Sequence, residues 1–210
     1  MHPPELDPRI KRTRAALREA LATLLRDHAF EDITLNDLAE IAGLNRATIY
    51  KHYPDKFALL DAWIADDLRD RLFTAMTAGF EHDPSLGTGH AKFYAVVAST
   101  CHCFEWIATL GRPDDRLLRP IAEARIRSLL DQAIAFAIEQ KVARVVAKFD
   151  AAPAMTSAVI SASASCWAYR PAKSKETLSS HVNKTLEALA SIVEPNPKLP
   201  PRLTRALVFT

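Results

Sequence analysis

Apolar residues recur near the start of the chain at the spacing of an amphipathic helix. Asp7 is suited to cap this segment, and a proline at the first helical position loses no hydrogen bond. The pattern predicts a first helix over about residues 8–27, with basic residues on its other faces. The apolar stripe consists of Ile10, Leu17, Leu21 and Leu24.

Two shorter helices are predicted next. Thr34 is suited to cap a helix over 35–42, and Asp37 stands three residues later, as in a weaker form of a capping box. Gly43 ends this helix because glycine adopts the left-handed conformation that other residues resist. Asn45 is suited to cap a third helix over 46–52, and a fourth begins at Pro54 and Asp55.

The remainder of the chain keeps the helical pattern, without strand-like alternation or an internal repeat. Residues 82–89 have the composition of a linker. Residues 195–210 form a proline-rich basic tail. The sequence therefore predicts an all-α protein, with later helices over about His90–Leu110, Asp114–Val146, Pro153–Tyr169 and Ser174–Glu194.

Composition places the chain among globular proteins. Of its 210 residues, 49% are hydrophobic and 25% charged, which excludes disorder along the whole chain. The net charge of +2 argues neither for nor against nucleic acid, because recognition depends on where charge lies. Three cysteines make no disulfide framework, and we see no signal peptide and no apolar run of membrane-spanning length. We expect a cytoplasmic protein.

The three short helices have the layout of a helix-turn-helix. A small Ala39 allows two helices to cross closely, Gly43 makes the turn, and Ile49 fills the space between the helices. Such a unit projects a short helix into the major groove, which is about 12 Å wide. An ordinary helical corner of an all-α enzyme has the same spacing, so the spacing alone favours DNA only mildly.

The third helix strengthens the DNA-binding hypothesis. Its residues are polar, long or hydroxyl-bearing, and no acid occurs from Arg46 to Tyr53. Ala47 is small enough to approach a base. Lys56 follows at the start of the fourth helix, where free N–H groups suit a phosphate.

The run from Thr34 to Lys56, TLNDLAEIAGLNRATIYKHYPDK, resembles the signature of the tetracycline-repressor (TetR/AcrR) family. The similarity covers about 9–63. Asn45 replaces the usual serine or threonine, and Phe57 stands where glutamate is common. The resemblance implies a dimeric, ligand-responsive transcriptional regulator, in most members a repressor, which binds a pseudo-palindromic operator in double-stranded DNA.

The resemblance also implies a role for individual residues. It assigns phosphate contacts to Thr34, Tyr50, His52 and Lys56. It assigns base edges to Arg46, Ala47 and Lys51, and we add Asn45 and Thr48 as candidate base readers. The implied division is a DNA-binding domain over 1–56, a helical effector-binding and dimerisation domain over 57–194, and the tail over 195–210.

The C-terminal part supplies candidates for dimerisation and effector binding. The helix predicted over 153–169 is rich in small residues and lies beside an apolar last helix, so we expect a four-helix dimer interface that an arginine at Ala164 disrupts. The resemblance to the family also implies an effector pocket, for which the candidates are Phe93, Val97, Cys101, Phe104, Glu105 and Trp167. An ordinary hydrophobic core explains the same residues equally well, and the identity of the effector stays open.

A metal site or an enzyme is a weaker hypothesis. Cys101 and Cys103 lie about 200° apart around a helix and cannot chelate one ion. An enzyme would use Cys101, His102 and Glu105, but no nucleophile–base–orienter order accompanies them. We therefore expect no metal, no cofactor and no catalysis. The alternative to a regulator is a dimeric helical small-molecule-binding protein or scaffold that has lost DNA binding.

Overall fold

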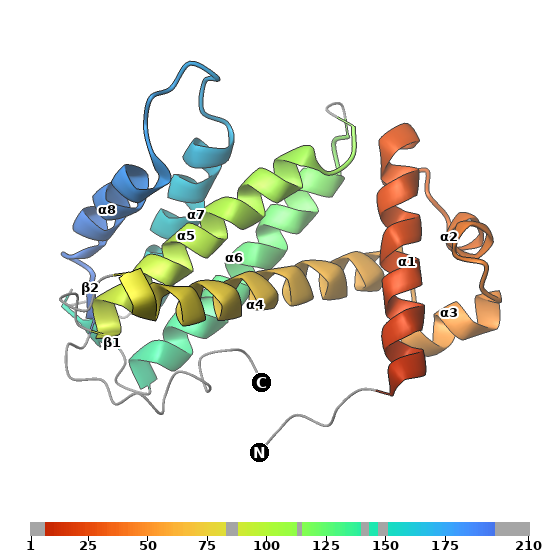
Figure 1. The fold of residues 1–210 in the computed structure, drawn as a ribbon, viewed down its shortest axis with the longest axis horizontal. Helices are drawn as coiled ribbons and strands as arrows, with labels where there is room; N and C mark the ends of the chain where they lie inside the picture. Colours follow the sequence, from red (N-terminus) through yellow and green to blue (C-terminus); the bar gives the residue numbers. More distant parts are fainter. Residues whose placement is uncertain (1–6, 83–87, 113–114, 140–142, 147–150, 196–210) are drawn as a thin grey trace. The chain divides into compact units, whose positions relative to one another are not determined.

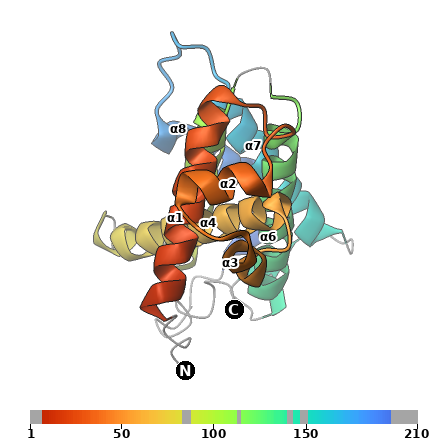
Figure 2. The ribbon, with the colours of Figure 1, turned by 90° about the vertical axis from the view of Figure 1, so that its right-hand side faces the viewer.

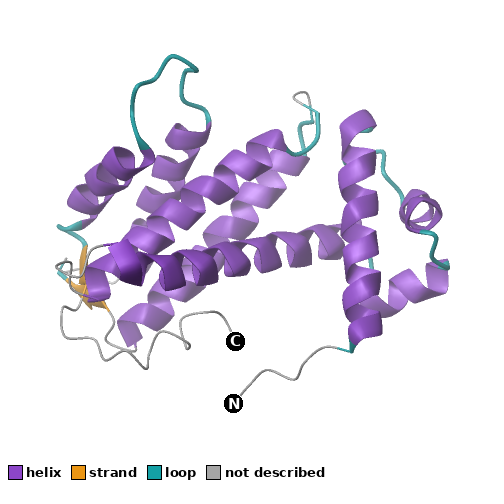
Figure 3. Cartoon of the chain, in the orientation of Figure 1, coloured by secondary structure: helices purple, strands orange, loops and turns teal. Residues whose placement is uncertain are grey.

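A computed structural model describes residues 7–82, 88–112, 115–139, 143–146 and 151–195. Helices dominate these ranges, with one small sheet (Figure 1, Figure 3), so the all-α fold class is confirmed. The tail was predicted over 195–210, and its residues from 196 onward lie outside the described residues. Most of the predicted linker also lies outside them. The helices are α1 (Pro8–Asp27), α2 (Leu35–Ala42), α3 (Arg46–His52), α4 (Lys56–His82), α5 (Thr88–Thr109), α6 (Leu118–Glu139), α7 (Ala152–Ala168) and α8 (Leu178–Leu189).

The chain divides into two compact units. Unit 1 comprises residues 1–64 and 109–122, and unit 2 comprises 65–108 and 123–210. The segment that joins α5 to α6 therefore belongs with the N-terminal helices, although it lies far from them in sequence. This grouping differs from the predicted boundary at residue 56, which follows the sequence motif rather than the packing.

Unit 1 is built on α1, with α2 and α3 lying against one side of it (Figure 1, Figure 2). The carboxylate of Asp7 accepts the Arg9 N–H at 2.8 Å and caps α1 as predicted. Leu17, Leu21 and Leu25 are wholly buried, which fixes the inward face of the helix. The predicted bounds of α1, α2 and α3 match the structure.

Unit 2 contains the helices α5, α7 and α8 and most of α6. A two-stranded antiparallel sheet joins β1 (Ala143–Val145) to β2 (Val193–Pro195), with Arg144 opposite Glu194. Helices were predicted through both segments, and that prediction is wrong. Ala143 and Val193 are buried in the short ladder, and Arg144 and Glu194 form an ion pair across it.

The first residues of α6 and α8 also differ from the prediction. α6 begins at Leu118 rather than Asp114, because Asp115 supplies the hydrogen bonds that open it. α8 begins at Leu178 rather than Ser174, because the Thr177 side chain accepts the Ser180 N–H at 3.2 Å and caps it there. Among the described residues, no helix is both long and apolar enough to cross a membrane.

Candidate nucleic-acid interface and effector region

The turn between α2 and α3 has the geometry of a helix-turn-helix. Gly43 adopts φ of 62°, in the left-handed region, and its N–H bonds to the carbonyl groups that end α2. Ala39 on α2 is buried, and Ile49 on the inward side of α3 is wholly buried. These three residues therefore have the packing roles that their spacing predicts.

The start of α3 is fixed by Asn45, whose side-chain oxygen accepts the Ala47 N–H at 2.8 Å. This cap occupies the Asn45 oxygen and leaves the amide nitrogen for another partner. Because Ile49 faces inward, the remaining side chains of α3 lie toward solvent or along its edges. The candidate DNA contacts on this helix thus surround the one buried position, with Arg46, Ala47, Tyr50 and Lys51 exposed.

Most of the candidate contact residues are exposed on unit 1. Thr48, His52 and Lys56 are half-buried. The Tyr50 side chain is 51% exposed, and the guanidinium of Arg46 lies 6.0 Å from the centre of its ring. The exposed candidates are Thr34, Asn45, Arg46, Ala47, Tyr50 and Lys51.

Lys56 has a set of partners that the sequence did not reveal. Its ammonium donates to the backbone carbonyl oxygens of Phe30 at 2.7 Å, Glu31 at 2.6 Å and Ile33 at 2.7 Å. It also lies 5.0 Å from the centre of the Phe30 ring. The phosphate contact assigned to Lys56 stays a prediction, and these bonds give the same side chain an internal role.

Asp115 is a buried acidic residue of unit 1 that sequence analysis missed. One of its oxygens accepts the Phe30 N–H at 2.7 Å. The other accepts the N–H groups of Leu117 at 3.0 Å and Leu118 at 2.9 Å. A proline followed by two aspartates before an apolar run is a helix-start signal, but nothing in it indicates the distant bond to Phe30.

The family model for bacterial regulatory proteins of the tetR family matches residues 17–63. This segment includes the second half of α1, all of α2 and α3, and the beginning of α4. Residues 17–63 are therefore a tetR-family segment. Because the match ends at residue 63, it does not extend to α5, α7 or α8.

Curated relatives match over part of the chain. The uncharacterized HTH-type transcriptional regulator YxbF of Bacillus subtilis (strain 168) is 27% identical over 122 residues, which are 51% of this chain and 32% of that protein. A probable acrEF/envCD operon repressor of Escherichia coli (strain K12) is 36% identical over 75 residues, 35% of this chain and 34% of that one. The chain thus spans about a third of the length of these relatives.

Solved structures share the fold over most of the chain. A TetR-family regulator from Streptomyces coelicolor A3 has a TM-score of 0.54 and 17% identity, covering 88% of this chain and 96% of its own. A TetR-family transcriptional regulator from Syntrophomonas wolfei has a TM-score of 0.53 and 14% identity, covering 85% and 93%. At this identity the likeness shows the fold alone.

The predicted effector residues all lie in unit 2. Glu105 is half-buried, whereas the others are buried. Trp167 is 5% exposed, and its indole nitrogen has no hydrogen-bond partner among the described residues. The buried members are Phe93, Val97, Cys101 and Phe104 on α5 and Trp167 on α7.

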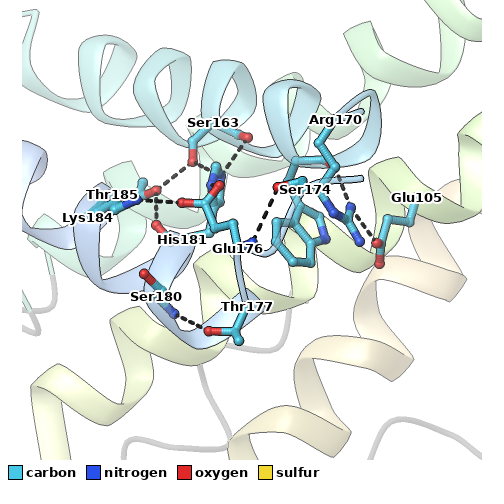
Figure 4. Close-up of polar contacts among 11 residues, drawn as sticks. Glu105, Ser163, Arg170, Ser174, Glu176, Thr177, Ser180, His181, Lys184 and Thr185 are labelled. Carbon is cyan, nitrogen blue, oxygen red and sulfur yellow. Dashed lines mark hydrogen bonds and ion pairs between the residues drawn. The ribbon is translucent and has the colours of Figure 1, made fainter. Parts of the chain in front are cut away.

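Arg170, which sequence analysis also missed, brings two of these candidates together. Its guanidinium donates to the Glu105 carboxylate at 2.9 Å and lies 3.5 Å from the centre of the Trp167 ring (Figure 4). His102 lies 3.2 Å from the other Glu105 oxygen. Glu105 is therefore paired with basic groups from two segments of unit 2, its own helix and the residues that follow α7.

The cysteines of α5 are not activated. Burial raises the pKa of the Cys101 thiol to about 12, and burial likewise raises the pKa of Cys103 well above its ordinary value. Thiolates are the nucleophiles and the metal ligands, so both side chains are inert at neutral pH. No group of three or more metal-binding side chains occurs among the described residues.

A polar network joins α7 to α8 (Figure 4). His181 Nε2 lies 2.9 Å from the Ser163 hydroxyl, and Nδ1 lies 3.4 Å from the Glu176 carboxylate, as in a serine–histidine–acid triad. However, Nε2 also lies 3.0 Å from the Ser163 carbonyl oxygen, which can only accept. Nε2 therefore donates to that carbonyl and does not act as the base that would activate Ser163. Its role is to link two helices.

The two sides of α7 differ in burial. Ala164 is wholly buried within the chain, so it does not lie on a free face. The opposite side is exposed and contains no charged residue. This α7 stripe consists of Ala151, Met155, Ala158, Ala162, Cys166 and Tyr169.

Proposed function

We propose that this chain is a sequence-specific DNA-binding transcriptional regulator, a repressor that a small-molecule effector releases from its operator. The observation that carries the proposal is α3, a helix-turn-helix element whose exposed side holds Arg46 and Lys51 and lacks any acid. A basic helix with one buried apolar residue is suited to the major groove of B-DNA.

The proposed contacts divide into base reading and backbone anchoring. Arg46 lies in the first turn of α3, where its two parallel donors can bind guanine O6 and N7. Lys51, Ala47, Thr48 and Asn45 are proposed to face neighbouring base edges. Anchoring to phosphates is assigned to Thr34, Tyr50 and His52, whose hydroxyl and imidazole groups donate hydrogen bonds that carry no sequence information.

A homodimer on a pseudo-palindromic operator fits the α7 stripe. The stripe is uncharged, and its small side chains allow a partner helix to approach closely. A twofold dimer presents two copies of α3 to half-sites about 34 Å apart, which is one turn of B-DNA. An effector acts on such a protein by favouring a conformation in which that separation no longer matches.

The effector is proposed to contact the residues around Trp167 in unit 2. The buried indole N–H of Trp167 is a donor without an acceptor, and buried polar groups in proteins are nearly always bonded. The aromatic and aliphatic side chains of Phe93, Val97, Cys101 and Phe104 supply an apolar lining, and Glu105 supplies a charge. An effector with an acceptor atom beside an apolar body matches this environment.

The test is a gel-shift titration against a duplex from upstream of the chain's own gene, with a scrambled duplex of equal length as the reference. A regulator binds the upstream duplex more tightly than the scrambled one. Equal weak binding of both supports the alternative, a helical small-molecule-binding protein or scaffold that has lost DNA binding. Arg46→Ala is the control variant, because it removes the proposed base reader and leaves the Ile49 packing intact.

A further inference from the structure

Phe30 lies in the turn between α1 and α2, and both of its peptide groups bind a charged side chain. Its N–H donates to the Asp115 carboxylate at 2.7 Å, and its carbonyl oxygen accepts from the Lys56 ammonium at 2.7 Å. The Phe30 ring is wholly buried and meets the Phe57 ring edge-on at 5.3 Å. Lys56, Phe30 and Asp115 are called the Phe30 cluster below.

All three protons of the Lys56 ammonium are donated to backbone carbonyl oxygens of the turn before α2. A lysine has three donors and no acceptor, and the carbonyl oxygens of Phe30, Glu31 and Ile33 lie 2.6–2.7 Å from Nζ. A phosphate contact by the same group requires one of these bonds to break. Lys56 is also the first residue of α4, so the bonds fasten the start of that helix to the turn that precedes α2.

Both oxygens of the Asp115 carboxylate are used as well. Asp115 is 7% exposed, and its second oxygen accepts the Leu117 and Leu118 N–H groups that open α6. A buried carboxylate is costly unless it is fully hydrogen-bonded, and these three N–H groups meet that need. The same carboxylate thus fixes the start of α6 and the Phe30 peptide.

The loop that carries Asp115 also packs closely on the rest of unit 1. Gly111 adopts φ of +67°, and a Cβ at this position would lie 2.6 Å from a Leu118 methyl carbon. The carbonyl oxygen of Leu25, at the end of α1, is 3.7 Å from the same point. Any larger residue at 111 is strained, so the loop is held close to α1.

We infer that Lys56 and Asp115 are positioning residues for DNA binding, which set the placement of α2 and α3 through the backbone of Phe30 without contacting DNA. The inference rests on the proposed DNA-binding function. It assigns Lys56 a role other than a phosphate anchor, and it assigns a role in operator affinity to Asp115, which lies 59 residues beyond Lys56 in sequence. Both helices that begin in the cluster, α4 and α6, continue along the chain into unit 2.

The salt dependence of DNA binding separates a positioning role from an anchor. Removing one phosphate-binding cation lowers the slope of log K against log salt by about 0.9. We expect Lys56→Met to weaken binding to the upstream duplex about tenfold, as for residues that modulate a distant site, with the slope unchanged. Lys51→Met is the matched control, because the exposed Lys51 ammonium is proposed to enter the groove and displace counterions there, so its removal should flatten the slope.

Asp115→Asn tests the other half of the cluster. Asparagine has the same shape but only one oxygen, so it cannot accept from both Phe30 and the start of α6. We expect faster amide hydrogen exchange, measured by NMR, at Phe30 or at Leu117 and Leu118, and weaker operator binding with an unchanged salt slope. Asp7→Asn is the control, because it neutralises another N-cap aspartate and should leave the Phe30 amide unaffected.

The results can overturn the inference in two ways. A flattened salt slope in Lys56→Met with unchanged exchange at Phe30 would show that Lys56 is an anchor. Unchanged exchange at Phe30, Leu117 and Leu118 together in Asp115→Asn would show that the carboxylate does not hold these peptides. Thermal melts of both variants confirm that they are folded at the temperature of the titration. If the wild-type chain binds no DNA, the proposed function fails, whereas the exchange measurement still tests the cluster.

Discussion

Thr34 and Asp37 hold each other in place at the start of α2. The Asp37 carboxylate accepts the Thr34 N–H at 2.8 Å and the Thr34 hydroxyl at 2.8 Å, and the Thr34 hydroxyl oxygen accepts the Asp37 N–H at 3.3 Å. The backbone hydrogen bond from Thr34 holds the pKa of Asp37 below its ordinary value, with a further contribution from the Thr34 side chain. The start of α2 therefore depends on a carboxylate that is ionised at neutral pH.

Neutralising Asp37 should make stability less dependent on acid. Because the folded-state pKa is depressed, the carboxylate stabilises the fold above its unfolded pKa, about 3.9, and loses this effect as pH falls through the folded value. We expect Asp37→Asn to melt below the wild type at pH 7 and the two melting temperatures to converge below about pH 4. Glu40→Gln, which removes a charge further along α2, is the control. A gap that persists in acid would contradict the role of the ionised carboxylate.

Removing the Thr34 side chain should weaken α2 directly. Loss of an N-cap hydroxyl costs about 1 kcal/mol of folding free energy. We expect Thr34→Ala to lower the free energy of unfolding by that amount in urea titrations, and Thr34→Ser to keep most of it. Because Thr34 is also a proposed phosphate contact, equal operator binding by the serine and alanine variants would assign the residue to capping alone.

Arg46 should be needed for sequence preference more than for DNA binding as such. We expect Arg46→Ala to cost about 1–3 kcal/mol on the operator and much less on a scrambled duplex, because the residue can read a guanine bidentately. Titrations of both duplexes at several salt concentrations measure the difference. An equal loss on both DNAs would make Arg46 an anchor and pass base reading to Lys51, Asn45 or Thr48.

The α7 stripe predicts where a dimer can be broken. We expect Ala162→Arg to yield a monomer by light scattering and to increase alkylation of Cys166, which lies on the same stripe. Ala135→Arg, at an exposed alanine of α6, should remain a dimer. An unaffected dimer in Ala162→Arg would place the interface elsewhere. Ala164→Arg does not test the interface, because an arginine at this buried site destabilises the subunit itself.

Cys101 and Cys103 should be inert in the folded protein. Their raised pKa values and full burial predict negligible alkylation at pH 8 in native buffer and complete alkylation in urea. Mass spectrometry after labelling measures the extent of modification at each residue. Stoichiometric zinc in the purified protein that is lost on Cys→Ser substitution would contradict this account.

The N-terminal helices were predictable because their limits are set locally. Thr34, Gly43 and Asn45 each act within a few residues of their own position, so the sequence pattern is sufficient to place α2 and α3. The exposed set on α3 was predictable for the same reason, since one buried residue, Ile49, determines which side faces outward.

The features that escaped prediction depend on partners far away in sequence. β1 and β2 are three residues each and pair across about 50 positions, too short for an alternating pattern to stand out. Ala162 and Ala164 are both alanines among other small residues, so the sequence does not indicate which one is buried. Only the packing of α7 shows that it is Ala164. The acceptors of Lys56 are backbone carbonyl groups, which every residue possesses, so no motif marks them.

That last property of the Phe30 cluster also governs how it can change during evolution. Lys56 and Asp115 form hydrogen bonds with the peptide groups of Phe30 and not with its side chain. These bonds therefore do not restrict the side chain at position 30, which is restricted by the buried space and the Phe57 ring. Relatives can exchange this residue for another apolar one and keep both bonds. Proline is the exception, because it lacks the N–H that Asp115 binds. A search for covarying residue pairs would therefore not detect the Phe30 cluster, whereas a single proline at position 30 would remove the bond to Asp115.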